Sequence, residues 1–222
     1  MPDPVHKSAQ PGRPRSNAAV SHAAIMDAVY ELLQERPARD LTMEAVAKRA
    51  NVGKPTLYKW WPSKAALILA MFNERLAGKL EAPVAATAEE AIRAKVRRLI
   101  KEFRGLFGKV MADLIAEGQS DPAILQELYE SHIRVRRAST VEDIERGKAT
   151  GEFSAGTNAE LLVDAIFAPV YYRHLLRFAP LTEKDGSDLI DQVLLGVRKE
   201  PNLSTRKSHR RLRAKAHWRS SE

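Results

Sequence analysis

The sequence predicts an all-α protein of about nine helices, and three observations support that class. Apolar residues recur at spacings of three and four along most of the 222 residues, which is the period of an amphipathic helix. No segment of strand length alternates between apolar and polar residues. Prolines and N-cap residues divide the chain into segments of ordinary helical length. The apolar fraction of 44% is that of a globular protein.

Composition divides the chain into four parts. Residues 1–20, rich in proline, serine and basic side chains, are expected to form a flexible basic arm. Two helical domains are expected over 21–80 and 81–200, and residues 201–222 are expected to form a disordered basic tail. This tail has seven basic residues and one acid, so it carries +6 of the net charge of +8. The net charge is therefore weak support for nucleic-acid binding by the folded domains.

The first domain is expected to contain four helices. They are expected over about 21–36, 43–50, 54–61 and 64–80. Pro37 and Pro62 end the first and third helices, and Thr42 and Ser63 cap the second and fourth. The residues expected to face inward are Ile25, Val29, Leu32, Leu33, Leu67, Met71 and Leu76.

The second domain is expected to contain five longer helices. They are expected over about 87–107, 109–118, 122–149, 158–178 and 183–199, with a loop at Gly151–Gly156. Capping boxes are expected at Thr87-x-x-Glu90 and Thr182-x-x-Asp185. Pro169 either kinks the fourth of these helices and shapes a cavity, or only bends it mildly. The apolar stripes of the first and last are Ile92, Val96, Leu99, Ile100, Phe103 and Phe107, and Leu189, Ile190, Val193, Leu194 and Val197.

The segment from Thr42 to Trp61 has the features of a helix-turn-helix. Asn51 is expected to adopt the left-handed conformation between two short helices, with Val52 plugging the turn. Leu57 and Trp61, four residues apart, are expected to hold the second helix inward. Its outward surface would then present Lys54, Thr56, Tyr58, Lys59 and Trp60. Such a helix fits the DNA major groove, where lysine can reach guanine O6 and N7.

Two further residues are placed for contacts with the DNA backbone. Thr42 lies at one helix N-terminus and Lys64 lies near another, where phosphates are bound well. Trp60 either faces DNA or joins the core. Arg13 and Arg15 either enter the minor groove or remain solvated. The tail residues Arg206–Arg219 either add salt-sensitive, non-specific affinity or stay disordered.

Residues 41–72 resemble the DNA-binding motif of the TetR family of transcriptional regulators. The resemblance is carried by the runs Gly53-Lys54-Pro55-Thr56-Leu57-Tyr58 and Pro62-Ser63-Lys64-Ala65-Ala66-Leu67. It implies an N-terminal three-helix helix-turn-helix DNA-binding domain plus a C-terminal helical ligand-binding and dimerisation domain. It also implies DNA contacts by Lys54, Pro55, Thr56, Tyr58, Lys59 and Trp60, with Lys64 on a phosphate. Gly53 departs from the serine of many members, which removes a hydroxyl.

The C-terminal half resembles one C-terminal type of the same family. The resemblance rests on Arg146-Gly147, Gly151-Glu152-Phe153 and the run 167–176. The helix at 158–178 is apolar over most of its circumference, so it must be buried on most faces. Its own domain covers one seam, and a second copy is expected to cover the rest. The expected homodimer joins the last two helices, 158–178 and 183–199, in a four-helix bundle, with Val193 and Leu194 at the contact.

A small-molecule pocket is expected between the helices at 88–107, 121–149 and 158–178. The candidate lining residues are Phe103, Phe107, Met111, Ile115, Phe167 and Tyr171, although residues of these types are more often plain core. Arg136, Arg137 and Arg173 either neutralise an acidic ligand or pair with acidic side chains, and pairing is favoured. No feature of the sequence selects an effector.

The sequence gives little support to catalysis, and no metal or cofactor is expected. There is no cysteine, and the six histidines form no close pair of metal ligands. The serine in Gly151–Gly156 has the spacing G-x-x-S-x-G and follows a helix, so it is not a nucleophile elbow. The first twenty residues contain no secretory signal, and no apolar run approaches the roughly 20 residues of a membrane span. A cytoplasmic protein is expected.

Three functions follow, in order of support. The first is a homodimeric repressor that binds a palindromic operator and is released by a small-molecule effector. The second is a constitutive or architectural DNA-binding regulator without an effector. The third, a small-molecule enzyme, would need a polar cluster in the C-terminal domain that the sequence does not show.

Overall fold

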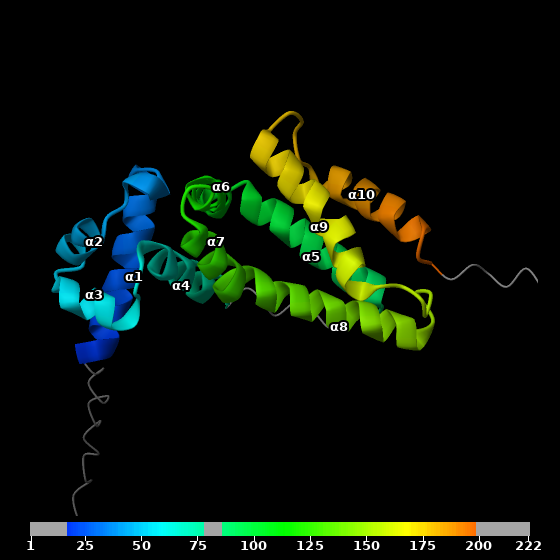
Figure 1. The fold of residues 1–222 in the computed structure, drawn as a ribbon, viewed down its shortest axis with the longest axis horizontal. Helices are drawn as coiled ribbons and strands as arrows, with labels where there is room; N and C mark the ends of the chain where they lie inside the picture. The colour runs from blue at the N-terminus through cyan, green and yellow to red at the C-terminus, as the bar shows by residue number, and fades with distance from the viewer. Residues whose placement is uncertain (1–16, 78–85, 199–222) are drawn as a thin grey trace, which may run out of the picture. The chain divides into compact units, whose positions relative to one another are not determined.

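The computed structural model describes residues 17–77 and 86–198, and it confirms the all-α class (Figure 1). In these ranges every regular element is helical, and an isolated β-bridge joins Phe153 to Arg198. Residues 17–20, predicted as part of the arm, belong to the first helix. The arginines of the arm and the basic tail at 201–222 lie outside the described residues. No described helix is long and apolar enough to cross a membrane.

The chain forms two compact units whose boundary differs from the predicted one. Lys109–His132, predicted to lie in the C-terminal domain, packs with the residues up to 77, and the second unit contains 86–108 and 133–198. Two carboxylates explain this placement. Asp113 accepts a hydrogen bond from the backbone N–H of Ala38 at 2.9 Å, and Glu117 pairs with Lys64. The boundary therefore falls at Gly108, inside a helix.

The first unit contains the four predicted N-terminal helices. Its elements are α1 (Asn17–Glu35), the 3-10 turn η1 (Ala38–Asp40), α2 (Met43–Arg49), α3 (Lys54–Trp60), α4 (Lys64–Ala77), most of α6 (Leu106–Gly118), α7 (Pro122–Leu128) and most of the π-turn η2 (Tyr129–Ile133). α1 packs against α2 and α4, and α4 also packs against α7. The predicted inward residues Ile25, Val29, Leu32, Leu33, Leu67 and Met71 are all buried, which confirms them. The side chain of Leu76 lies outside the described residues.

The second unit packs four helices around one apolar core. Its helices are α5 (Ala88–Phe103), α8 (Arg134–Thr150), α9 (Ala159–Leu176) and α10 (Glu183–Leu195). α5 packs against α8 and α10, and α9 packs against both of these as well (Figure 1). The two predicted capping boxes, at Thr87–Glu90 and Thr182–Asp185, are both formed. α9 is continuous through Pro169.

The prediction that the first helix of this half continues to Phe107 is wrong. α5 ends at Phe103 and a new helix, α6, begins at Leu106. The chain turns there because Gly108 can approach the backbone of Phe103. A Cβ on Gly108 would lie 2.1 Å from the Phe103 carbonyl oxygen, so no residue with a side chain fits at this position.

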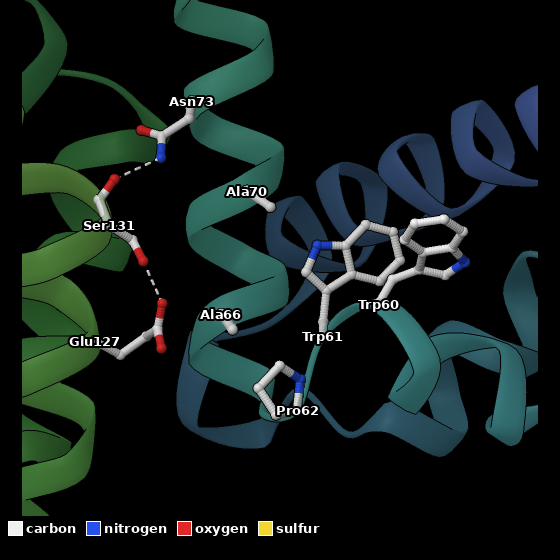
Figure 2. A pocket seen from close by; sticks show the side chains of 8 residues that line it. All are labelled: Trp60, Trp61, Pro62, Ala66, Ala70, Asn73, Glu127 and Ser131. Atoms are coloured by element: carbon white, nitrogen blue, oxygen red, sulfur yellow. Dashed lines mark hydrogen bonds between the residues drawn. The ribbon is translucent and has the colours of Figure 1, made fainter.

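The prediction of one continuous helix from Pro122 to about Ala149 is also wrong in detail. A π-turn, η2, interrupts it and separates α7 from α8. The Ser131 carbonyl accepts a hydrogen bond at 2.8 Å from the Asn73 side-chain amide of α4, as Figure 2 shows. The buried His132 ring bonds the oxygen of the same amide at 2.8 Å. The wider π-turn leaves a backbone carbonyl without its usual partner within the helix. Asn73, far away in the sequence, donates a hydrogen bond to this carbonyl.

The loop after α8 closes the second unit. Gly151 has φ of 80°, and its neighbour Glu152 places its carboxylate on the N-terminus of α5, 2.9 Å from the Ala88 nitrogen. Phe153 is fully buried against Gly147 of α8. The loop thus supplies α5 with a second cap besides its own capping box, and its aromatic ring fills the space above Gly147.

We expect Gly147→Ala to lower the free energy of unfolding by about 1–3 kcal/mol through overpacking. The new Cβ would lie 2.5 Å and 2.6 Å from two carbons of the Phe153 ring and 2.8 Å from the Ala88 Cβ. Guanidinium denaturation measures the effect. Gly156→Ala is the matched control, because a Cβ there has no neighbour closer than 3.9 Å. Equal stability of the two variants would contradict the packing.

Candidate DNA-binding surface

The helix-turn-helix has the predicted local geometry. The Thr42 hydroxyl caps α2 by accepting from the Ala45 nitrogen at 3.1 Å. Asn51 has φ of 52°, which confirms the left-handed turn residue. The Val52 nitrogen donates to the Ala47 carbonyl at 3.0 Å, and its side chain is half-buried in the turn. Gly53 is the N-cap of α3 without a side-chain bond, as the missing hydroxyl implies.

Two side chains of the α3 segment hold it against the rest of the first unit, as predicted. Leu57 is completely buried and Trp61, the C-cap residue of α3, is nearly so. The Trp61 ring lies 5.4 Å from the ring of His22 in α1, and His22 in turn bonds Glu74 of α4 at 2.8 Å. α3 is therefore fixed against helices that come before and after it in the chain.

The opposite side of α3 is an exposed surface of cations and aromatic rings. Lys54, Pro55 and Lys59 are exposed, Thr56 is half-buried, Tyr58 is 51% exposed and Trp60 is 62% exposed. The Lys59 ammonium lies 5.6 Å from the centre of the Trp60 ring. Since two aromatic side chains of this size are rarely left in water without a function, the surface is a candidate binding face. The structure places Trp60 outside the core.

Lys54, the first residue of α3, has a partner that the sequence did not indicate. Its ammonium forms an ion pair with the carboxylate of Glu44, in the first turn of α2. Both side chains are about half exposed. The hydrogen bond from Lys54 lowers the pKa of Glu44, with a smaller contribution from the Glu44 backbone, so this carboxylate is charged at neutral pH. Helical periodicity could not reveal the pair, because the two residues lie ten positions apart across a turn.

Lys64 is placed differently from the other predicted DNA contacts. Its ammonium donates to Glu117 of α6 at 2.7 Å and to the Arg39 carbonyl at 3.3 Å, and its side chain is only 21% exposed. The second oxygen of Glu117 is buried without a hydrogen bond among the described residues. In this structure Lys64 therefore ties α6 to the start of α4, while Ser63 caps α4 as predicted.

A groove of about 420 Å³ lies beside the C-terminal end of α3 (Figure 2). Its lining residues are Trp60, Trp61, Pro62, Ala66, Ala70, Asn73, Glu127 and Ser131. Small side chains of α4 form one wall, and α7 and η2 supply its polar end, where Ser131 donates to Glu127. None of the six predicted ligand-binding residues lines this groove.

The six predicted ligand-binding residues are divided between the two units. Met111, buried, and Ile115, half-buried, belong to the first unit. In the second unit the Phe103 ring stacks on Phe107 with centroids 6.1 Å apart and meets the edge of Tyr171 at 5.0 Å. Phe103 also stacks on His174 at 4.1 Å. Phe167 is half-buried. Burial raises the pKa of the Tyr171 hydroxyl, which therefore stays neutral.

The three arginines considered for an acidic ligand are all paired with acidic side chains, as favoured from the sequence. Arg136 bonds Glu102 at 2.9 Å, and Arg173 lies 3.2 Å from Asp185. Arg137 pairs with both Asp164 and Glu160 of α9. Among the described side chains, no group of three histidine, aspartate or glutamate residues could hold a metal ion.

Comparison with known proteins agrees with this geometry. The family described as "Bacterial regulatory proteins, tetR family" matches residues 25–71. The family described as "Tetracyclin repressor-like, C-terminal domain" matches residues 69–193, more than half of the chain. The chain belongs to the TetR family of bacterial transcriptional regulators. It is thus a DNA-binding helix-turn-helix regulator of a non-enzymatic family, which confirms the resemblance found in residues 41–72.

Individual proteins are similar to this chain in sequence or in fold. The HTH-type transcriptional regulator YdeS of Bacillus subtilis is 31% identical over 186 residues, which cover 84% of this chain and 93% of YdeS. The crystal structure of the TetR-family regulator SCO0332 is 29% identical with a TM-score of 0.69, covering 81% of this chain and 99% of that one. FadR from Bacillus subtilis, solved in complex with stearoyl-CoA, shares the fold with a TM-score of 0.63 at 18% identity, over 80% of this chain and all of FadR.

We expect Lys64→Ala to lower the free energy of unfolding by about 1–2 kcal/mol. This is the contribution of a hydrogen bond between charged groups, reduced because the pair is partly exposed to solvent. The substitution would leave Glu117 without its cation and one of its oxygens buried. Urea denaturation measures the loss. Lys59→Ala is the control, because no carboxylate pairs with Lys59 among the described residues. A loss no larger than the control's would show that the Glu117 pair contributes nothing.

Proposed function

We propose that this TetR-family regulator is a homodimeric repressor that binds a palindromic operator on chromosomal DNA in the cytoplasm and is released by a small-molecule effector. The observation that carries the DNA-binding part is the exposed face of α3. It combines lysines and aromatic rings on a helix that Leu57 and Trp61 hold rigidly from behind. A rigid helix with an exposed polar face is what insertion into the major groove requires.

Each exposed residue of the face has a proposed contact. Lys54 and Lys59 supply charge for guanine or phosphate, and Thr56 with Pro55 supplies apolar contact for a thymine methyl. The Tyr58 hydroxyl and the Thr42 hydroxyl are proposed to bind phosphates, and Trp60 is proposed to pack on the sugar-phosphate backbone or a thymine methyl. Lys64 joins them only by exchanging Glu117 for a phosphate, because its ammonium is engaged in the free protein.

The proposal of a homodimer rests on an exposed apolar stripe along α9, whose last ring, Tyr172, contacts the ring of Phe178 at 5.1 Å. Leu161, Ala165, Ala168 and Tyr172 follow at spacings of four, three and four, and all are exposed. The opposite side of α9 is buried within its own unit, so this stripe needs a second surface. On α10, Leu195 is 64% exposed. We propose that these two faces and their symmetry mates form the predicted four-helix bundle.

The choice of contact residues on α10 has to be corrected. Leu194, predicted at the dimer contact, is completely buried within its own protomer, and Val193 is half-buried. The helical period was right, but two adjacent apolar residues on one helix point in different directions, and the sequence could not tell which faces the core. Leu195 is the exposed member of the pair.

Effector release is proposed from the second unit and from solved relatives. The aromatic cluster around Phe103, with Phe107, Tyr171 and His174, is the proposed wall of an effector site. FadR from Bacillus subtilis binds stearoyl-CoA in its crystal structure, and another relative of the same fold is described as a flavonoid-responsive regulator. The second candidate, a regulator without an effector, rests on the contacts of the Phe103 ring with three neighbouring rings, which a bound effector would have to displace.

We expect Lys54→Ala and Tyr58→Phe to weaken operator binding while leaving the oligomeric state unchanged. Lysine loss removes about 1–3 kcal/mol, or roughly fivefold to 150-fold in the dissociation constant. The operator comes from selection out of random DNA, and fluorescence anisotropy gives the affinities. Lys184→Ala, an exposed lysine of α10, is the control. Unchanged affinity in both α3 variants would place the recognition surface elsewhere.

We expect Tyr172→Glu to convert a dimer into monomers, because it would place two charges inside an apolar bundle. Sedimentation velocity gives the oligomeric state. Val135→Glu on α8 is the matched control, since Val135 is 62% exposed and lies outside α9 and α10. A Tyr172→Glu protein that remains dimeric, or a control that dissociates equally, would overturn the bundle.

A further inference from the structure

We infer that Glu44 and Lys54 act as one unit that recognises a single G·C base pair in each half-site. The inference rests on the proposed operator binding and goes further, because it assigns a base pair and a second residue to the recognition surface. Glu44 belongs to α2, outside the recognition helix. No single-helix description of the site would include it.

The position of the pair carries the first step. Lys54 is the first residue of α3, and the N-terminal residues of a recognition helix are those that contact base edges. Glu44 lies in the first turn of α2, and its carboxylate accepts from the Lys54 ammonium. Both side chains are about half exposed, so a donor and an acceptor are presented to solvent side by side.

The charge of Glu44 carries the second step. A carboxylate on a DNA-facing surface is repelled by the phosphates of every sequence, so it lowers affinity for DNA in general. It also attracts the Lys54 ammonium, which would otherwise turn to the nearest phosphate. Glu44 therefore weakens non-specific binding to DNA, and it directs the Lys54 ammonium toward the base edges of the major groove. Both effects favour discrimination over affinity.

The chemistry of base pairs carries the third step. In the major groove, guanine offers the acceptors N7 and O6, and its partner cytosine offers the N4 amino donor. O6 and N4 are neighbours, because they are hydrogen-bonded to each other within the pair. A lysine donor beside a glutamate acceptor matches this edge, with lysine on guanine and glutamate on cytosine. An A·T pair is a poorer match in both orientations. With adenine in the place of guanine, the N6 donor and the thymine O4 acceptor reverse the two central groups. With thymine in that place, O4 and the adenine amino group fit, but the thymine methyl replaces the N7 acceptor that the lysine also contacts.

Lys59 provides the internal contrast. It is also exposed on α3, but its ammonium lies over the Trp60 ring, and none of the described carboxylates pairs with it. Lys59 is therefore suited to a phosphate, which every sequence offers. The two lysines therefore differ in one respect: Lys54 has a carboxylate partner, and Lys59 has an aromatic ring instead.

The test selects binding sites from random double-stranded DNA with the full-length wild type and with Glu44→Ala. We expect the wild-type site to contain one G·C pair, repeated symmetrically, that is preferred by about tenfold or more over A·T. With Glu44→Ala that preference should fall to within about threefold, while affinity for random DNA should rise. Glu145→Ala removes a similarly exposed acid that pairs with Lys148 in the second unit, and it should leave the selected site unchanged.

The outcomes separate the inference from the proposed function. A wild-type protein that selects no sequence would overturn operator binding, and the inference with it. A wild-type site that Glu44→Ala selects unchanged, with or without tighter binding to random DNA, would overturn the inference alone. Circular dichroism melting shows that the variant is folded. Glu44→Gln, which keeps the size of the side chain and an acceptor oxygen but loses the charge that holds the Lys54 ammonium, should weaken the preference for G·C, so the result does not depend on one variant.

Discussion

The burial of Leu57 and Trp61 is the contact on which the recognition surface depends. A helix of seven residues such as α3 has too few internal hydrogen bonds to be stable alone in water. It exists because these two side chains are buried in the first unit, where α3 packs against α2 and the Trp61 ring contacts His22 of α1. The same contact fixes which residues remain outside, so the exposure of Tyr58 and Trp60 is a consequence of it. The residues that anchor α3 and the residues that it exposes for binding therefore belong to the same short segment, 54–61.

Local signals predicted most of the fold, because they act within a few residues. N-caps such as Thr87 and Thr182, the left-handed Asn51 and the inward Leu57 are all visible in sequence order. The errors arose where one specific contact decides, in one case between residues near each other in the chain and in the other between distant ones. The approach of Gly108 to Phe103 ends α5 early, and Asn73 of α4 bonds the π-turn that interrupts the helix after α7. No periodicity encodes either contact.

The recognition surface was predictable as a list of residues but not as a set of charges. Motif and spacing placed Lys54, Lys59 and Trp60 on the exposed side of α3. They could not show that Glu44 neutralises one lysine and Glu117 another, since both pairs join separate helices. The net positive charge of this surface is therefore smaller than its number of lysines suggests. Electrostatic attraction to DNA begins from this partly compensated state.

The closing loop of the second unit bears on how the protein is made. The N-terminus of α5 is capped by Glu152, 64 residues further along the chain, and Glu89 pairs with Arg198 at a separation of 109 residues. A ribosome releases the chain from its N-terminus at about 5–20 residues per second. α5 must therefore wait several seconds for its cap, and longer for its last ion pair. The second unit can complete its fold only after Arg198 has left the ribosome.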